Sequence, residues 1–476
     1  MKDPKYLPNC VEIMSIIHDT IKSFYHDAQR DDEFENTATI PLGGDQLTRV
    51  TFDSARSLRA GAHSRSDRLE QFSPVIEELF HIEQDLLEKI VNHFFSSKSS
   101  REVGTLANYK AVLHRTNVNG QVKSTNGFEP HKDFVHTVAR AMVVELMCEK
   151  QQIQNKTSDI QMPEHIKVWK TAKKIEWLDR FVEPVVDTIM NTYKAPDMSD
   201  VEIRVLYKGG LYMLKIPASS RGKNIDVNIN GDKVRIDVPP EARSPVYIGD
   251  DVYNYSLSFL RASMDLMLLH YVIKAGDIDR LTVLMKRFIP LFIGLTSFKS
   301  KYAIECVNFL AKTEHILSEF ESVRVKLGAF VNVSGKPGKN KAADMQQENN
   351  IKQVKNVIRS LGASKTDKAM ERSSKAAPVI YELISDLESS LGITTNSKRN
   401  KKSSVEDLSV LFDKMRQLRP FEVHVNRALP AFSGSSDNVV NNVDKFKLRD
   451  FITRHSKRTL NRTACDLNNE EQDFEV

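Results

Sequence analysis

A single carboxylate, Asp45, follows a Gly-Gly pair in the stretch LGGDQLTRV. Gly43 and Gly44 allow the backbone to leave a strand sharply, and a side chain at the carboxyl end of a strand faces the crevice where open α/β sheets bind ligands. An Asp at this position also caps a following helix by accepting a hydrogen bond from a backbone N–H of its first turn. The local sequence favours the helix cap and leaves a catalytic role for Asp45 open.

A second pair of carboxylates, Asp344 and Glu348, lies four residues apart near the start of a predicted helix. This spacing places both on one edge of the helix, just after a lysine-rich loop, where they can hold a divalent cation against a phosphate. Acidic residues near a helix N-terminus also stabilise the helix dipole, by roughly 0.3–1 kcal/mol each. Spacing alone favours the dipole interpretation.

Arginines accompany the first of these acids. Arg49, Arg56 and Arg59 gather on one face of the helix predicted over residues 48–60 and can bring a phosphate backbone to the neighbouring carboxylate. In the alternative interpretation, Asp53 pairs with Arg49 at i, i+4 and nearby acids neutralise the other two. Both interpretations stay open.

A basic stretch accompanies the second pair, since residues 328–402 contain 14 Lys and Arg against 7 Asp and Glu. Such a stretch can contact a phosphate backbone, although a lysine-rich surface is more often only solvated. The spacing in SGKPGKNK does not match the phosphate-binding loop of nucleotide-binding proteins. The candidate DNA-binding lysines are Lys336, Lys339, Lys341 and Lys355, beside the three arginines above.

The composition is that of a soluble globular protein: 40% of the 476 residues are hydrophobic, 28% are charged, and the net charge is +5. A chain of this length exceeds one ordinary core, so two or three structural units are expected. The four cysteines show no paired spacing, which argues against a zinc ribbon or a disulfide framework. Because no signal peptide or membrane-spanning stretch is predicted, we expect an intracellular protein, nuclear or cytoplasmic, without a membrane partner.

Helical periodicity dominates the sequence. Between residues 200 and 240, however, apolar and polar residues alternate about Gly209-Gly210 and Asn230-Gly231, a strong signal for β-hairpins. We therefore predict a mainly α-helical α+β fold with a small α/β core and an inserted hairpin module. The predicted units are an N-terminal helix with an acidic loop (1–36), the start of the α/β core with a helical region (37–199), the hairpin insertion (200–248), a helical region with the basic loop (249–395), a basic linker (396–404), and a C-terminal helix with a disordered tail (405–476).

Four blocks of sequence, in order, resemble a family of unknown function. They are LGGDQLTRV with the residues that follow it, GTLANYKAVLHRTNV, AGDIDRLTVLMKRFIPLF, and FVNVSGKPGKNKAADMQQ with the helix that it opens. The sequence is identified as similar to domain-of-unknown-function family 6589, which is abundant in invertebrate and fungal genomes, over residues 37–380. That family looks like a group of DNA-transposon proteins.

The resemblance implies a site by analogy with transposases of the RNase H-like fold. Asp45 and Glu348 would be its acids, with Asp344 nearby and His81 as a further family landmark. Such enzymes use two Mg²⁺ or Mn²⁺ ions about 3.5–4 Å apart for strand cleavage or transfer. Longer family members carry an additional Gly-Asp-Asn block upstream, which this chain lacks, so the resemblance points to a truncated or domesticated derivative with a degenerate site.

Two functions are consistent with these features. The first is a transposon-derived, DNA-binding protein with residual metal-dependent nuclease activity. The second is a non-catalytic scaffold that binds a protein partner through the hairpin module. A continuous basic surface would favour the first and an exposed apolar patch the second.

Overall fold

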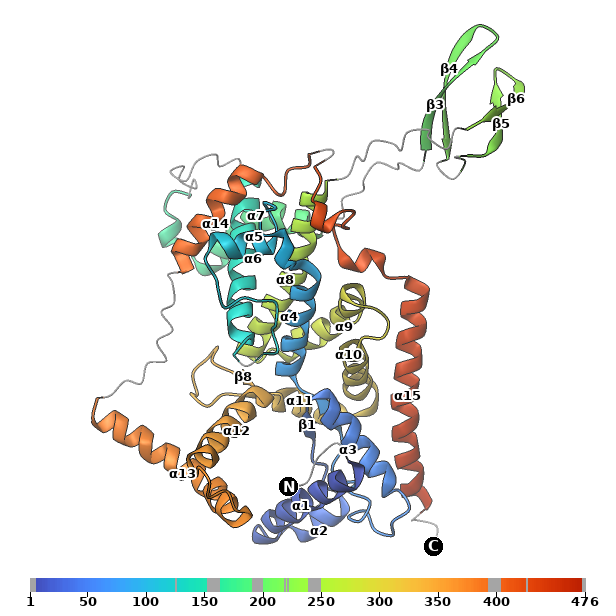
Figure 1. Ribbon diagram of the computed structural model, residues 1–476. Helices are drawn as coiled ribbons and strands as arrows, with labels where there is room; N and C mark the ends of the chain where they lie inside the picture. The colour runs from blue at the N-terminus through green and yellow to red at the C-terminus, as the bar shows by residue number, and fades with distance from the viewer. Residues whose placement is uncertain are drawn as a thin grey trace.

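The structure is a computed structural model. It describes residues 6–124, 126–151, 163–190, 200–217, 220, 222–238, 250–392, 404–424 and 427–472. Helices dominate these residues, and the strands form four small sheets of two strands each (Figure 1). The predicted α+β class with a mainly helical fold is confirmed. None of the described helices is both long and apolar enough to cross a membrane.

The helices are distributed over the whole chain. Before the hairpin module they are α1 (Leu7–Asp27), α2 (Asp31–Asn36), α3 (Gln46–Leu58), α4 (Leu79–Phe94), α5 (Leu106–Val112), α6 (Phe128–Lys150) and α7 (Thr171–Met190). After it they are α8 (Asp251–Ala275), α9 (Ile278–Leu295), α10 (Lys301–Ala311), α11 (Glu319–Gly328), α12 (Ala343–Ser360), α13 (Asp367–Ser390), α14 (Ser404–Leu418) and α15 (Lys445–Gln472). A π-helical turn, Lys312–Ile316, continues α10.

Each described strand pairs with the strand that precedes or follows it in chain order. The parallel pair is β1 (Leu42–Gly44) with β2 (Val75–Glu77). The antiparallel pairs are β3 (Asp200–Tyr207) with β4 (Gly210–Pro217), β5 (Asn224–Ile229) with β6 (Asp232–Asp237), and β7 (Phe330–Val331) with β8 (Lys341–Ala342). The described residues add no third strand to β1 and β2, so an RNase H-like core remains a prediction of the sequence.

The main hydrophobic core lies around the long helix α8, which packs against α4, α6 and α9. One buried hydroxyl joins three of the helical segments. Tyr255 on α8 donates a hydrogen bond to the Phe94 carbonyl over 2.6 Å and accepts one from the Leu106 amide over 3.1 Å. The end of α4 and the start of α5 are thereby fixed to the centre of the body.

A smaller core unites α1, α3 and the β1–β2 pair, with Cys10, Met14, Phe52 and Phe72 among its buried side chains. The residues expected as an acidic loop form the short helix α2 instead, with three acidic side chains in its first turn. Acidic groups at that end complement the helix dipole, which explains why a charged sequence adopts this helix.

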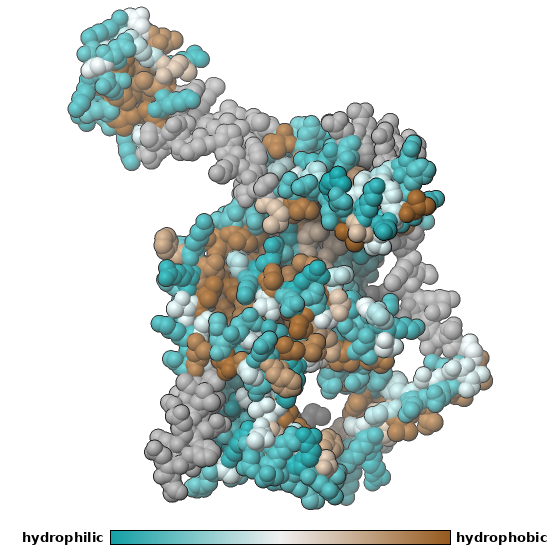
Figure 2. Space-filling view, turned by 180° about the vertical axis from the view of Figure 1, so that it is seen from behind, coloured by the Kyte–Doolittle hydropathy of each residue, from teal (hydrophilic) through white to brown (hydrophobic). Residues whose placement is uncertain are grey.

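The hairpin module has a third, separate core. Apolar side chains of both hairpins gather at its centre, as Figure 2 shows from the rear. The second turn lies at Asn230-Gly231, as predicted, with φ angles of 53° and 93°. The first turn is displaced by one residue to Lys208-Gly209, because Gly210 already pairs with Tyr207 in the β3–β4 ladder.

The C-terminal region contains more helix than the sequence indicated. The predicted linker 396–404 falls outside the described residues, except for Ser404 at the start of α14. Helix α15 extends to Gln472 through most of the segment expected to be disordered, and residues 473–476 lie outside the description. Phe451 of α15 is buried in the main core, and the helix packs against α10. This contact stabilises the part of α15 around Phe451.

Replacing Tyr255 by Phe should lower the free energy of unfolding by about 1–3 kcal/mol, because a buried carbonyl and a buried amide both lose their partner. Urea denaturation followed by circular dichroism measures this change. Tyr271→Phe on the same helix is the matched control, because Tyr271 is 55% exposed. The control should stay within about 0.5 kcal/mol of the wild type. Equal losses for the two variants would contradict the assigned role of Tyr255.

Candidate functional site

The carboxyl ends of β1 and β2 bring acidic residues together. Gly44 lies opposite Glu77 in the parallel register, and the chain continues into Asp45 after β1 and Glu78 after β2. Because side chains alternate between the faces of a sheet, Glu77 and Glu78 point to opposite sides. Asp45 therefore follows a strand, as the sequence predicted, with two further carboxylates beside it.

Asp45 caps α3. The Thr48 amide donates a hydrogen bond to Asp45 Oδ1 over 2.7 Å, and the Asp45 backbone is extended, as is usual for a residue that precedes the first helical turn. The capping interpretation is confirmed, while a catalytic role for Asp45 remains a prediction.

Asp344 reaches from α12 to the start of α4. Its side chain is buried and accepts hydrogen bonds from the Phe80 amide over 3.0 Å and the His81 amide over 3.1 Å. These amides belong to the first turn of α4, whose own preceding residue, Glu78, makes no capping hydrogen bond. Asp344 thus supplies from a distant helix the carboxylate that satisfies the N-terminus of α4.

His81 contacts one of the three acids predicted from the sequence, Asp344. Its Nδ1 lies 2.9 Å from Asp344 Oδ2. Burial opposes protonation of the imidazole, but the hydrogen bond to Asp344 and the charges of Asp344, Asp45 and Glu348 raise the pKa of His81. Asp344 is therefore the predicted acid that contacts His81, whereas Asp45 and Glu348 act on it only through their charge, and Glu348 itself is exposed.

Glu77 is the most unusual group of the cluster. It is only 2% exposed, and neither of its carboxyl oxygens has a hydrogen-bond partner among the described residues. Burial, followed by the charge of Glu305, raises the pKa of Glu77 to about 10. The charges of Asp45 and Asp344 raise this pKa by smaller amounts, and the charge of Arg49 lowers it. Glu77 is thus a neutral acid at physiological pH.

Glu78 occupies the other face of β2. Burial and the charge of Asp344 raise the pKa of Glu78 to about 7, against the effect of His81. Its carboxylate lies over Gly43, where an added Cβ would come within 1.8 Å of Glu78 Oε1. This close approach accounts for the first glycine of the Gly-Gly pair.

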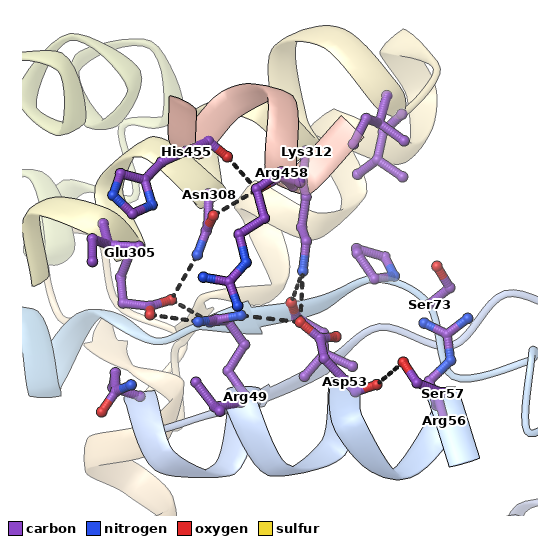
Figure 3. A pocket seen from close by; sticks show the side chains of 18 of the residues that line it. Arg49, Asp53, Arg56, Ser57, Ser73, Glu305, Asn308, Lys312, His455 and Arg458 are labelled. Carbon is purple, nitrogen blue, oxygen red and sulfur yellow. Dashed lines mark hydrogen bonds and ion pairs between the residues drawn. The ribbon is translucent and has the colours of Figure 1, made fainter. Parts of the chain in front are cut away.

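The three arginines of α3 do not share one surface. Arg49 is buried and donates hydrogen bonds to Glu305 Oε1 over 2.6 Å and to Asp53 Oδ2 over 3.0 Å, which confirms the predicted i, i+4 pair (Figure 3). Arg56 is half-buried and lines a cavity, whereas Arg59 is exposed. Because its guanidinium is enclosed, Arg49 cannot meet an external phosphate.

The predicted lysines do share one exposed region. Lys336, Lys339 and Lys341 lie exposed on the loop closed by β7 and β8, and Lys355 is exposed on α12. In the sequence these lysines lie more than 270 residues after the arginines, and Glu77, Glu78 and Glu305 fall between the two sets. Of the candidate DNA-binding residues, Arg49 is therefore buried and Arg56 half-buried, whereas Arg59 and the four lysines are exposed.

The acidic residues do not form a metal site as they stand. Within the described ranges, no group of three or more His, Cys, Asp or Glu side chains is placed to hold a metal ion. Backbone amides occupy Asp45 and Asp344, and the pKa of Glu77 keeps it protonated, whereas a carboxylate ligand must be ionised. We derive no metal-dependent step, and Mg²⁺ or Mn²⁺ remains a prediction of the sequence.

Sequence reasoning missed Glu77, Glu78 and Glu305. Their common signal is a carboxylate inside an apolar run, in PVIEELF and in YAIECVNFL. A charged residue at a position patterned for burial needs a partner or an altered pKa, so such a position marks a candidate site.

Residues 12–400 match DUF6589, a family of unknown function. The chain belongs to this family. The match begins within α1, earlier than the resemblance indicated, and spans the hairpin module. No curated protein and no solved structure matches the chain. Membership of DUF6589 thus supports the expected relationship without assigning an activity.

For this DUF6589 protein, Asp45→Ala should lower the free energy of unfolding by about 0.5–2 kcal/mol, because α3 loses its cap. Asp45→Asn should leave the free energy close to that of the wild type, since Asn is an equally good cap. Thermal and urea denaturation of the two variants side by side measure the difference. A similar loss for both variants would show that the charge of Asp45, and not its capping bond, stabilises the fold.

Glu77→Gln should change the pH dependence of stability. The raised pKa means that folded Glu77 stays neutral between its usual value of 4.5 and about 10, while the unfolded chain ionises. This difference destabilises the fold increasingly as pH rises through that window. Between pH 5 and pH 8 the free energy of unfolding of Glu77→Gln should rise relative to the wild type by about 4 kcal/mol, which is about 1.4 kcal/mol for each pH unit.

Urea denaturation of the wild type and Glu77→Gln at both pH values measures this relative change. The comparison isolates ionisation from any packing difference, because packing is common to both conditions. Glu348→Gln is the control, since Glu348 is exposed and should show no comparable change. Parallel pH profiles for the wild type and Glu77→Gln would contradict the assignment of a neutral Glu77.

Proposed function

We propose that this chain binds the phosphate backbone of DNA through residues 332–375, the basic arm. The basic arm consists of the loop after β7, strand β8, α12 and the first part of α13. Ten Lys and Arg residues lie between Lys336 and Lys375, and all ten are exposed. Only four acidic residues lie in the same stretch, and one of them, Asp344, is buried. This excess of exposed positive charge is the observation that carries the proposal.

The shape of the basic arm suits an extended ligand. It projects from the helical body, and α12 and α13 pack on each other (Figure 1). An 18-residue helix such as α12 is about 27 Å long, which corresponds to about eight base pairs of duplex DNA. The basic side chains can therefore follow several consecutive phosphates.

Asp344 fixes one end of the basic arm to the body. The arm would otherwise be joined to α4 only by weaker packing of α12, and each phosphate contact would carry the cost of ordering the whole segment. The buried hydrogen bonds from Phe80 and His81 to Asp344 hold the start of α12 in place. A preorganised arm retains more of its contact energy as affinity.

Transposon origin and residual strand cleavage are further parts of the proposal. The resemblance to transposon proteins supports the origin, and binding to DNA is consistent with it. The charges of Asp45 and Glu348 both act on His81, which supports a residual site. The capping bond of Asp45, and the lack of a metal-ready group among the described residues, weigh against cleavage.

The triple variant of Lys336, Lys339 and Lys341 to Gln tests the arm. Fluorescence anisotropy with a labelled DNA duplex should show weaker binding, because three phosphate contacts are lost. The slope of log affinity against log salt should fall by about 2–3, since each phosphate contact contributes about 0.9. The matched control changes three exposed lysines on another surface, Lys167, Lys170 and Lys173, and should retain the wild-type slope.

Equal salt slopes for the arm variant and its control would contradict binding through the basic arm. The same samples test cleavage, with Mg²⁺ or Mn²⁺ added and a supercoiled plasmid as substrate. Metal-dependent nicking that disappears in Asp45→Asn would establish a residual nuclease. Binding without nicking would restrict the function to DNA binding.

A second function, binding of a protein partner, is favoured by one observation. The later half of α13 exposes an apolar stripe at intervals of four residues, Val379, Leu383, Leu387 and Leu391, each between 56% and 63% exposed. This stripe appears as brown along the projecting helices in Figure 2. If the wild type fails to bind DNA, the stripe becomes the better indication of function.

A further inference from the structure

A cavity of about 520 Å³ lies between α3, the segment before β2, α10 with its π-helical turn, and α15. Its volume is typical of pockets that bind small organic ligands. Helix α15 closes one side, where the Thr459 hydroxyl donates a hydrogen bond to Asn308 Oδ1 over 2.6 Å. The cavity is therefore assembled from three regions that are far apart in the sequence: residues 46–75, residues 301–317 and residues 455–459 (Figure 3).

The lining of the cavity carries excess positive charge. Five cationic side chains face two carboxylates, those of Asp53 and Glu305. Both carboxylates are already engaged by the buried Arg49. The remaining cationic lining residues are Arg56, Lys301, Lys312 and Arg458.

Lys312 shows the effect of this crowding. Its Nζ donates a hydrogen bond to the Val75 carbonyl over 2.6 Å and lies 3.7 Å from Asp53 Oδ2. Burial lowers the pKa of Lys312, and the charges of Arg49 and Arg56 lower it further. The charges of Asp53 and Glu305 raise this pKa but do not offset the decrease. An anion in the cavity would relieve this repulsion. The π-helical turn that begins at Lys312 is a local feature often found at functional sites.

Arg458 extends from α15 into the cavity, and its guanidinium has no hydrogen-bond acceptor within the described part of the chain. A guanidinium presents several N–H donors in a plane that matches the oxygens of a phosphate. The other side of the cavity is apolar, with Val50, Val75, Ile304 and Leu317 in its wall. The ligand should therefore combine an anionic group with an organic part.

We propose that this cavity binds a phosphate monoester of small-molecule size. The phosphate faces Arg458 and the neighbouring cations, and the organic group packs against the apolar wall. The site is distinct from the basic arm, because none of the arm residues lines the cavity. The two sites also differ in the ligand that they bind. The cavity encloses one terminal phosphate group, whereas the basic arm contacts successive phosphates of a DNA backbone.

Isothermal titration calorimetry of the full chain with adenosine monophosphate, inorganic phosphate and adenosine tests this site. The monophosphate should bind more tightly than phosphate, since only it fills the apolar side, and adenosine should not bind. Arg458→Gln should weaken binding of the monophosphate about tenfold or more, because a charge-assisted hydrogen bond is lost. Arg454→Gln is the matched control, because Arg454 is exposed on the same helix and does not line the cavity.

Wild-type affinity in Arg458→Gln, or no binding of the monophosphate at millimolar concentration, would overturn the proposal. Lys301→Gln provides a second test at an exposed lining residue, so that a folding defect in one variant does not decide the outcome. A 5′-phosphorylated dinucleotide that competes with the monophosphate would identify a DNA end as the source of the same chemical group. Failure to compete would identify the free monoester.

Discussion

The carboxylate of Asp344 connects parts of the molecule that the chain keeps far apart. It satisfies the first turn of α4, which belongs to the main core, and it begins α12, which carries the basic arm. An uncapped, buried helix end would leave amides without partners, so this contact supports both the core helix and the arm. The same carboxylate raises the pKa of His81 and, after burial, contributes to the raised pKa of Glu78, about 7.

The β1–β2 pair separates two environments of opposite charge. On the side of His81 the cluster is acidic, and around Arg458 and Lys312 it is basic. The Arg49–Glu305 ion pair belongs to the lining of the basic cavity, and the charges of both residues act on the buried Glu77. Charges interact more strongly in such a buried region than across water, which couples the acidic cluster to the cavity.

Local patterns predicted local structure well. The Asp45 cap, the Asn230-Gly231 turn and the i, i+4 pair of Arg49 with Asp53 all depend on residues within a few positions of each other. The sequence could not indicate that Glu305 would enclose Arg49, because that partner lies 256 residues away. Its acidic and polar last residues suggested a disordered tail, whereas α15 continues to Gln472.

The position of α15 has a consequence for the order of synthesis. Arg458, His455 and Thr459 line the cavity but lie beyond residue 400, where the match to the family ends. A nascent chain folds its earlier units as they leave the ribosome, so α3 and α10 meet before the last wall exists. The cavity becomes enclosed only after α15 has been synthesised. A ligand held there would consequently distinguish molecules that contain α15 from those that lack it, and proteolysis that removed α15 would release the ligand.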